Sequence, residues 1–92
     1  MSLTEHLTNA ERSLRYASEA ASLTATQWCL NDALGSLEKA LALAEVDVWP
    51  IVVAAINCSI DELQEDDHEV EIVRSMVELL GKTAQLHEEI RS

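Results

Sequence analysis

Phenylalanine is absent from this chain of 92 residues, glycine occurs only twice and proline only once. Because Gly and Pro are the residues that most often mark turns and interrupt helices, their scarcity predicts few and short connections. The only aromatic residues are Tyr16, Trp28 and Trp49, so the core must be built from Leu, Ile, Val and Ala. Apolar side chains recur with helical spacing through nearly all of the sequence. We therefore predict an all-α fold.

Positive charge is also scarce, with six Lys and Arg against 17 Asp and Glu and a formal net charge of −11. Direct binding of nucleic acid or of an anionic membrane requires Lys and Arg, so we expect neither. Cys29 and Cys58 are too few for a disulfide framework, and reduced thiols are typical of the cytoplasm. No basic and apolar leader is present, and the longest apolar run, residues 51–56, is too short to span a bilayer. We predict a cytoplasmic protein.

The chain has the length of one domain, residues 1–92, and its apolar periodicity predicts four helices, at about residues 3–23, 27–45, 49–64 and 67–89. Ser2, followed three residues later by Glu5, has the pattern of a capping box at the start of the first helix. We predict a compact antiparallel bundle of these helices. A single bent helix over residues 3–45 is the alternative to the first break, since nothing at residues 23–26 forbids a helix.

The first predicted helix has an apolar stripe with alternating spacings of four and three residues, which is typical of a seam between two helices. The fourth predicted helix has two adjacent stripes and should therefore touch two neighbours. One contains Ile72, Met76, Leu79, Thr83, Leu86 and Ile90, and the other contains Val73, Val77, Leu80 and Ala84. These stripes exceed what a small monomer needs to bury, so we predict a homodimer that uses the first or the fourth helix. The candidate interface residues are Leu3, Leu7, Ala10, Leu14 and Ala17.

Negative charge is concentrated between the third and fourth predicted helices, where residues 61–71 contain seven Asp and Glu and no Lys or Arg. Residues 1–46 have a net charge of −3 and residues 47–92 of −8. Such a cluster steers the approach of a partner protein with a basic surface. The candidate partner-binding residues are Asp61, Glu62, Glu65, Asp66, Asp67, Glu69 and Glu71.

No pattern typical of catalysis, of a metal site or of a cofactor site is present. His6, His68 and His87 lack the short spacing of zinc ligands, and the acidic run lacks the Asp/Asn alternation and Gly of a calcium loop. A nucleophilic Cys29 or Cys58 would need a base nearby, which no motif supplies. We therefore expect no catalytic, metal-binding or cofactor-binding residues, and a protein that is not an enzyme.

The sequence predicts a non-catalytic, acidic protein–protein interaction module, such as a small cytosolic adaptor, regulator or chaperone-like partner. The main alternative is an inhibitor that imitates the charge of nucleic acid and occupies the basic cleft of a DNA- or RNA-binding protein. Clustering of the carboxylates at one junction, rather than along a ridge, favours the first function. A third hypothesis is a small-ligand pocket near Trp28 or Trp49, although each indole is expected to cap an end of the core.

Overall fold

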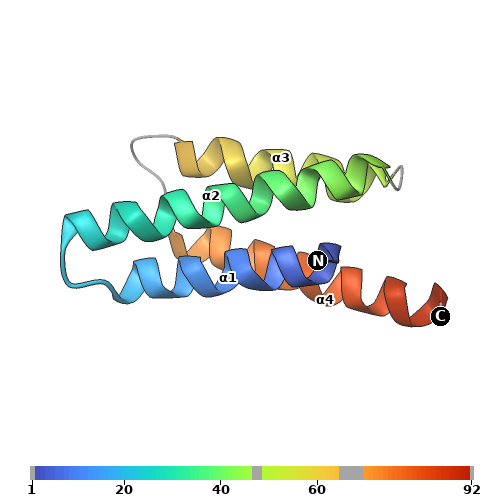
Figure 1. Ribbon diagram of the computed structural model, residues 1–92, viewed down its shortest axis with the longest axis horizontal. Helices are drawn as coiled ribbons and strands as arrows, with labels where there is room; N and C mark the ends of the chain where they lie inside the picture. Colours follow the sequence, from blue (N-terminus) through green and yellow to red (C-terminus); the bar gives the residue numbers. More distant parts are fainter. Residues whose placement is uncertain (1, 47–48, 65–69, 92) are drawn as a thin grey trace.

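The computed structural model describes residues 2–46, 49–64 and 70–91. It contains four helices, α1 (Leu3–Glu19), α2 (Leu23–Val46), α3 (Pro50–Gln64) and α4 (Val70–Arg91), and no strand among the described residues. Consecutive helices run in opposite directions and form an elongated bundle of 42 × 20 × 19 Å (Figure 1). The prediction of a compact all-helical bundle is therefore confirmed. None of the described helices is long and apolar enough to span a membrane.

The break between the first two helices is confirmed, and the alternative of one bent helix is wrong. α1 ends at Glu19 rather than at residue 23, because Ala20 is extended (φ −67°, ψ 139°). The hydroxyl oxygen of Ser22 then accepts a hydrogen bond from the backbone N–H of Ala25 at 3.1 Å, as an N-cap residue does. α2 therefore begins at Leu23, four residues earlier than predicted.

The other helix ends lie close to their predicted positions. The backbone N–H of Glu5 donates to the hydroxyl of Ser2 at 3.2 Å, which confirms the first N-cap. Pro50 is the first residue of α3, where the missing N–H is tolerated. α4 continues to Arg91, two residues past its predicted end, while its predicted start at residue 67 lies outside the described residues.

The four helices form a ring in which α1 contacts α2 and α4, and α3 contacts the same two helices. The core between them is aliphatic, and its largest fully buried apolar side chains are Leu7, Leu14, Leu37, Val52, Ile56, Val73 and Val77. Alanines complete the core, because a small side chain lets two helices approach closely. Those at 0% exposure are Ala10, Ala33, Ala40, Ala44 and Ala84.

The candidate dimer residues of the first helix all belong to this core. Leu3, Leu7, Ala10, Leu14 and Ala17 are at most 6% exposed and pack in one cluster with residues of the other helices. Their heptad-like spacing therefore serves helix–helix contacts within the chain, and this seam is not exposed to a second copy in the described bundle.

Candidate interaction surfaces

The two apolar stripes predicted on the fourth helix have different environments. Val73, Val77 and Ala84 are buried in the core, and Leu80 packs against it. The second row, here called the α4 stripe, consists of Ile72, Met76, Leu79, Thr83, Leu86 and Ile90. α4 does contact two neighbours, as predicted, but it does so largely without this second row.

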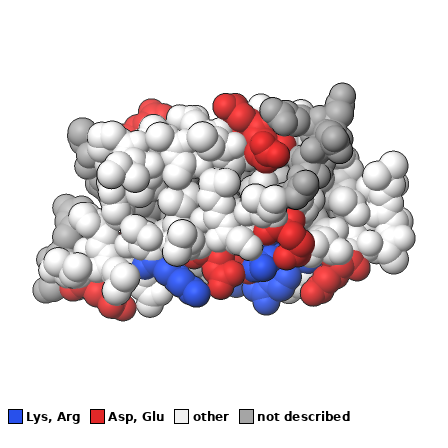
Figure 2. Space-filling model, turned by 180° about the vertical axis from the view of Figure 1, so that it is seen from behind, with Lys and Arg blue, Asp and Glu red and all other residues white. Residues whose placement is uncertain are grey.

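The aliphatic residues of the α4 stripe lie on the surface. Ile72, Leu79 and Leu86 are 58%, 65% and 60% exposed, and Ile90 is 83% exposed. Figure 2 views the molecule from the side of α3 and α4 and shows a broad area without charged side chains, bordered along its lower edge by a row of charged ones. Exposed apolar surfaces with a polar rim are common at interaction sites.

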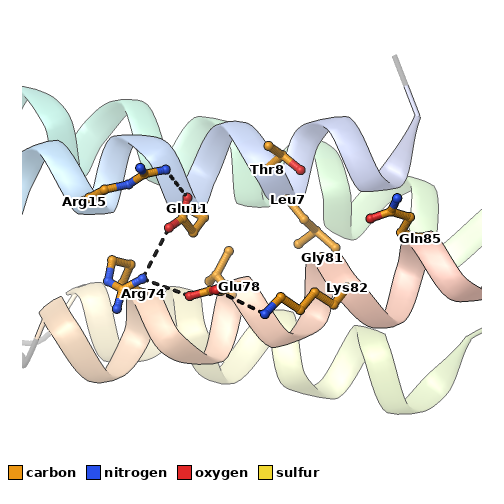
Figure 3. Close-up of a pocket in the computed structure, with 10 residues that line it drawn as sticks. Leu7, Thr8, Glu11, Arg15, Arg74, Glu78, Gly81, Lys82 and Gln85 are labelled. Carbon is orange, nitrogen blue, oxygen red and sulfur yellow. Dashed lines mark hydrogen bonds and ion pairs between the residues drawn. The ribbon is translucent and has the colours of Figure 1, made fainter.

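The opposite flank of α4 packs on α1 through an ion-pair network (Figure 3). Its charged members are Glu11, Arg15, Glu71, Arg74, Glu78 and Lys82. Arg74 lies at the centre, because its guanidinium binds Glu78 at 3.0 Å and Glu71 at 3.1 Å on its own helix and Glu11 of α1 at 3.3 Å. The side chain of Glu11 is only 13% exposed, so Arg74 provides a counter-charge where water is largely excluded.

These contacts change the acidity of two carboxyl groups. Hydrogen bonds from Ser18 and then from Arg74 lower the pKa of Glu71, and hydrogen bonds from Lys82 and then from Arg74 lower the pKa of Glu78. Both groups therefore stay ionised and paired at neutral pH. Glu71, one of the candidate partner-binding residues, is thus already engaged by a cation of its own helix.

A groove of about 430 Å³ lies between α1 and α4 beside this network. Gly81 faces α1 there, and a Cβ added at Gly81 would lie 3.8 Å from the Cβ of Leu7, an ordinary contact distance. The neighbour of Gly81 on α1 is therefore a side chain rather than backbone. The charged groups that line the groove are paired with one another, so the groove offers little net charge to a ligand.

A second surface lies on the first turns of α2, which extend past the end of α3 (Figure 1). Trp28 is 71% exposed and Leu23 is 85% exposed. Together with Thr24, Gln27 and Asn31 they line an open hollow of about 500 Å³, here called the α2 hollow. The expectation that Trp28 caps the core is therefore wrong. Trp49 does pack against the core, with its ring 4.2 Å from the ring of His87.

The structure describes only part of the predicted acidic junction, residues 61–71. Asp61 is exposed and Glu62 partly buried at the end of α3, and Glu71 is in the first turn of α4. Glu65, Asp66, Asp67 and Glu69 lie outside the described residues.

Charge is divided unevenly between two halves of the bundle. Between residues 16 and 73 the sequence contains twelve Asp and Glu but only one Lys or Arg, Lys39. The other five Lys and Arg belong to α1 and α4, where the ion-pair network lies. Within the described helices, α2 and α3 together contain five Asp and Glu against one Lys, whereas α1 and α4 contain seven Asp and Glu against five Lys and Arg.

The described residues show no group of three or more His, Cys, Asp or Glu that could hold a metal ion. Both cysteines are free, with Cys29 partly buried and Cys58 exposed. Comparisons of the chain with protein-family models, with curated proteins and with solved structures found no significant match. Fold and surfaces together define a small four-helix bundle with two exposed apolar surfaces.

Proposed function

We propose that this chain is a non-catalytic protein–protein interaction module that binds a protein with a basic surface through its α2–α3 half. The observation that carries this proposal is the exposure of Trp28 and Leu23 side by side with an open hollow on α2. Tryptophan is among the residues most enriched at the energetic centres of protein interfaces, because it buries a large area with few rotatable bonds. A folded chain that exposes such a side chain is suited to binding another macromolecule there.

The chemistry around the α2 hollow indicates what the partner carries. The hollow is lined by the apolar side chains of Leu23 and Trp28 and by three polar, uncharged residues, so it suits an aliphatic or aromatic side chain of the partner. Asp32 lies one helical turn beyond Trp28 on an exposed part of α2. The nearest Lys or Arg further along α2 is Lys39. A partner that inserts an apolar side chain and surrounds it with Lys and Arg therefore complements both features.

A capture experiment with matched variants tests this proposal. The wild-type chain, Trp28→Ala and Val46→Ala are immobilised separately, and extract from the source organism is passed over each at moderate salt. Val46 is a suitable control because it is 78% exposed at the other end of the same helix. We expect at least one protein with a basic surface to be retained by the wild type and by Val46→Ala and lost from Trp28→Ala. Identical retention by all three chains would refute the role of the hollow.

The same captured protein separates this function from imitation of nucleic acid. An inhibitor that works by charge would lose its partner steeply with rising salt and in the double variant Asp61→Lys/Glu62→Lys, while Trp28→Ala would have little effect. An apolar anchor predicts the reverse order, with Trp28→Ala the more damaging change. The two outcomes are measured in one series of binding titrations at about 0.05 and 0.5 M NaCl.

A further inference from the structure

We infer that the α4 stripe is the interface of an antiparallel homodimer of this chain. Its six positions, 72, 76, 79, 83, 86 and 90, are separated by four, three, four, three and four residues. This series of spacings reads the same in both directions, so the stripe is complementary to itself when a second copy runs the opposite way. A symmetric dimer requires this kind of self-complementary surface, because both copies use the same patch.

The pairing that follows is specific. With the two-fold axis near position 81, Ile72 lies opposite Ile90 of the second copy, Met76 opposite Leu86, and Leu79 opposite Thr83. Each layer then joins a residue of the a type with one of the d type, as antiparallel helix pairs do. The 19 residues from Ile72 to Ile90 correspond to roughly 27 Å of helix, enough for a continuous seam.

The two atypical members of the stripe are compatible with burial. The hydroxyl of Thr83 donates a hydrogen bond to the carbonyl of Leu79 at 2.9 Å. Thr83 therefore keeps this hydrogen bond when a second copy displaces water from the stripe. Met76 is already partly buried, and the hydroxyl of Ser59 lies 3.3 Å from its sulfur, so α3 holds this side chain in place. Neither residue therefore opposes the association of two stripes.

The nearly balanced charge of α4 favours a second copy over a basic protein as the occupant. α4 carries Arg74, Lys82 and Arg91 against four carboxylates, whereas α2 and α3 together carry one Lys against five carboxylates. Near the axis each Lys82 brings its own partner Glu78, which it binds at 3.3 Å, so two cations and two carboxylates meet there.

Sedimentation equilibrium tests the dimer on the full chain. We expect the wild type to dimerise, Leu79→Glu to raise the dissociation constant at least about 100-fold, and Val46→Glu, at an exposed position off the stripe, to leave it unchanged. Because each chain has a net charge of −11, raising NaCl from about 0.05 to 0.5 M should strengthen the dimer several-fold. Circular dichroism of Leu79→Glu verifies that the variant remains folded. A wild type that stays monomeric up to about 1 mM, or a folded Leu79→Glu with unchanged dissociation constant, would overturn the inference.

Disulfide cross-linking tests the orientation. In a background of Cys29→Ala and Cys58→Ala, chains with Ile72→Cys are mixed with chains that carry Ile90→Cys and then oxidised. An antiparallel dimer gives cross-links between the two different chains, whereas a parallel dimer gives only links between identical chains, and mass spectrometry distinguishes them. Links between identical chains alone would contradict the antiparallel geometry. A chain found to be monomeric would leave binding at the α2 hollow untouched, so the two proposals fail separately.

Discussion

Arg74 is the residue at the centre of the ion-pair network between α1 and α4. It binds two carboxylates on its own helix and one on α1, and the α1 carboxylate, Glu11, has little access to water. Removal of the guanidinium would leave Glu11 with Arg15 as its remaining cation at 2.9 Å. The contact between the two helices therefore depends on Arg74 more than its place near the surface suggests.

This network gives the stability of the chain a defined pH dependence. The pKa values of Glu71 and Glu78 are lower in the folded chain than the ordinary value of 4.5, so their stabilising contribution is present above that value. It is lost as the pH falls through the folded values, because both carboxylates must then be protonated. We expect Arg74→Gln to lower the melting temperature at pH 7, and to lose less stability than the wild type when the pH falls from about 5 to 3.

Thermal unfolding followed by circular dichroism at several pH values measures this difference. Arg12→Gln is the control, since Arg12 is an exposed arginine of α1 outside the network. Parallel pH profiles for the wild type and Arg74→Gln would show that the network does not set the acid sensitivity.

Gly81 provides a second prediction at the scale of one residue. A Cβ at this position would lie at ordinary contact distance from Leu7, and a Cβ at Gly35 would meet nothing within 4 Å. Because alanine favours a helix over glycine, Gly81→Ala and Gly35→Ala should each raise the free energy of unfolding by about 0.5–1 kcal/mol. Gly81→Leu should lower it, since atoms beyond Cβ would collide with Leu7. Urea denaturation measures all three, and a destabilised Gly81→Ala would contradict the packing described here.

The sequence predicts part of the Arg74 network and not the rest. Glu71 and Glu78 stand three residues before and four residues after Arg74, a spacing that pairs charges on one helix. The third contact, to Glu11, joins residues 63 positions apart and depends on how α1 and α4 are rotated against each other. Periodicity within one helix carries no information about that rotation.

At the scale of the helix, α1 and α4 show that the spacing of an apolar stripe does not determine whether the stripe is buried in the core or exposed. Both have stripes with alternating spacings of four and three residues. The stripe of α1 is buried in the core. The α4 stripe is exposed, because α4 packs into the core through a different row of residues, Val73, Val77 and Ala84. The sequence predicted the width of the apolar face of α4 correctly, but the packing decides which part of it remains outside.

Two leucine substitutions test this assignment. Leu14 is 0% exposed, so Leu14→Ala should lower the free energy of unfolding by about 2–5 kcal/mol. Leu86 is 60% exposed, so Leu86→Ala should change the stability of the monomer by less than about 0.5 kcal/mol. Urea denaturation of dilute protein compares the two variants. Equal losses would mean that the α4 stripe belongs to the core of the single chain.

The helix breaks illustrate what local sequence determines. The apolar stripe of the first helix, if continued in phase, would place Thr24, Trp28 and Asn31 in the core, which is a poor core. This loss of phase correctly predicted a break, and it also contained the signal for the α2 hollow, whose walls include these three residues. The sequence alone does not predict that Trp28 is exposed, because its exposure depends on α2 extending past the end of α3.

At the scale of the whole molecule, two different surfaces lie on two halves of the bundle. The half formed by α1 and α4 combines paired charges with an apolar stripe, which suits a second copy of the same chain. The half formed by α2 and α3 combines excess carboxylates with an exposed Trp28, which suits a basic partner. The sequence shows the net charge, and the packing of the helices shows where each surface lies.

We propose that the α2 hollow binds another protein. The most direct test of this binding is a nuclear magnetic resonance titration of the isotope-labelled full chain with the protein captured on it. Binding at the hollow predicts that the largest chemical-shift changes fall on residues 23–32 and on the end of α3, with the ion-pair network of α1 and α4 undisturbed. Changes centred on the groove between α1 and α4, with residues 23–32 unaffected, would contradict the claim.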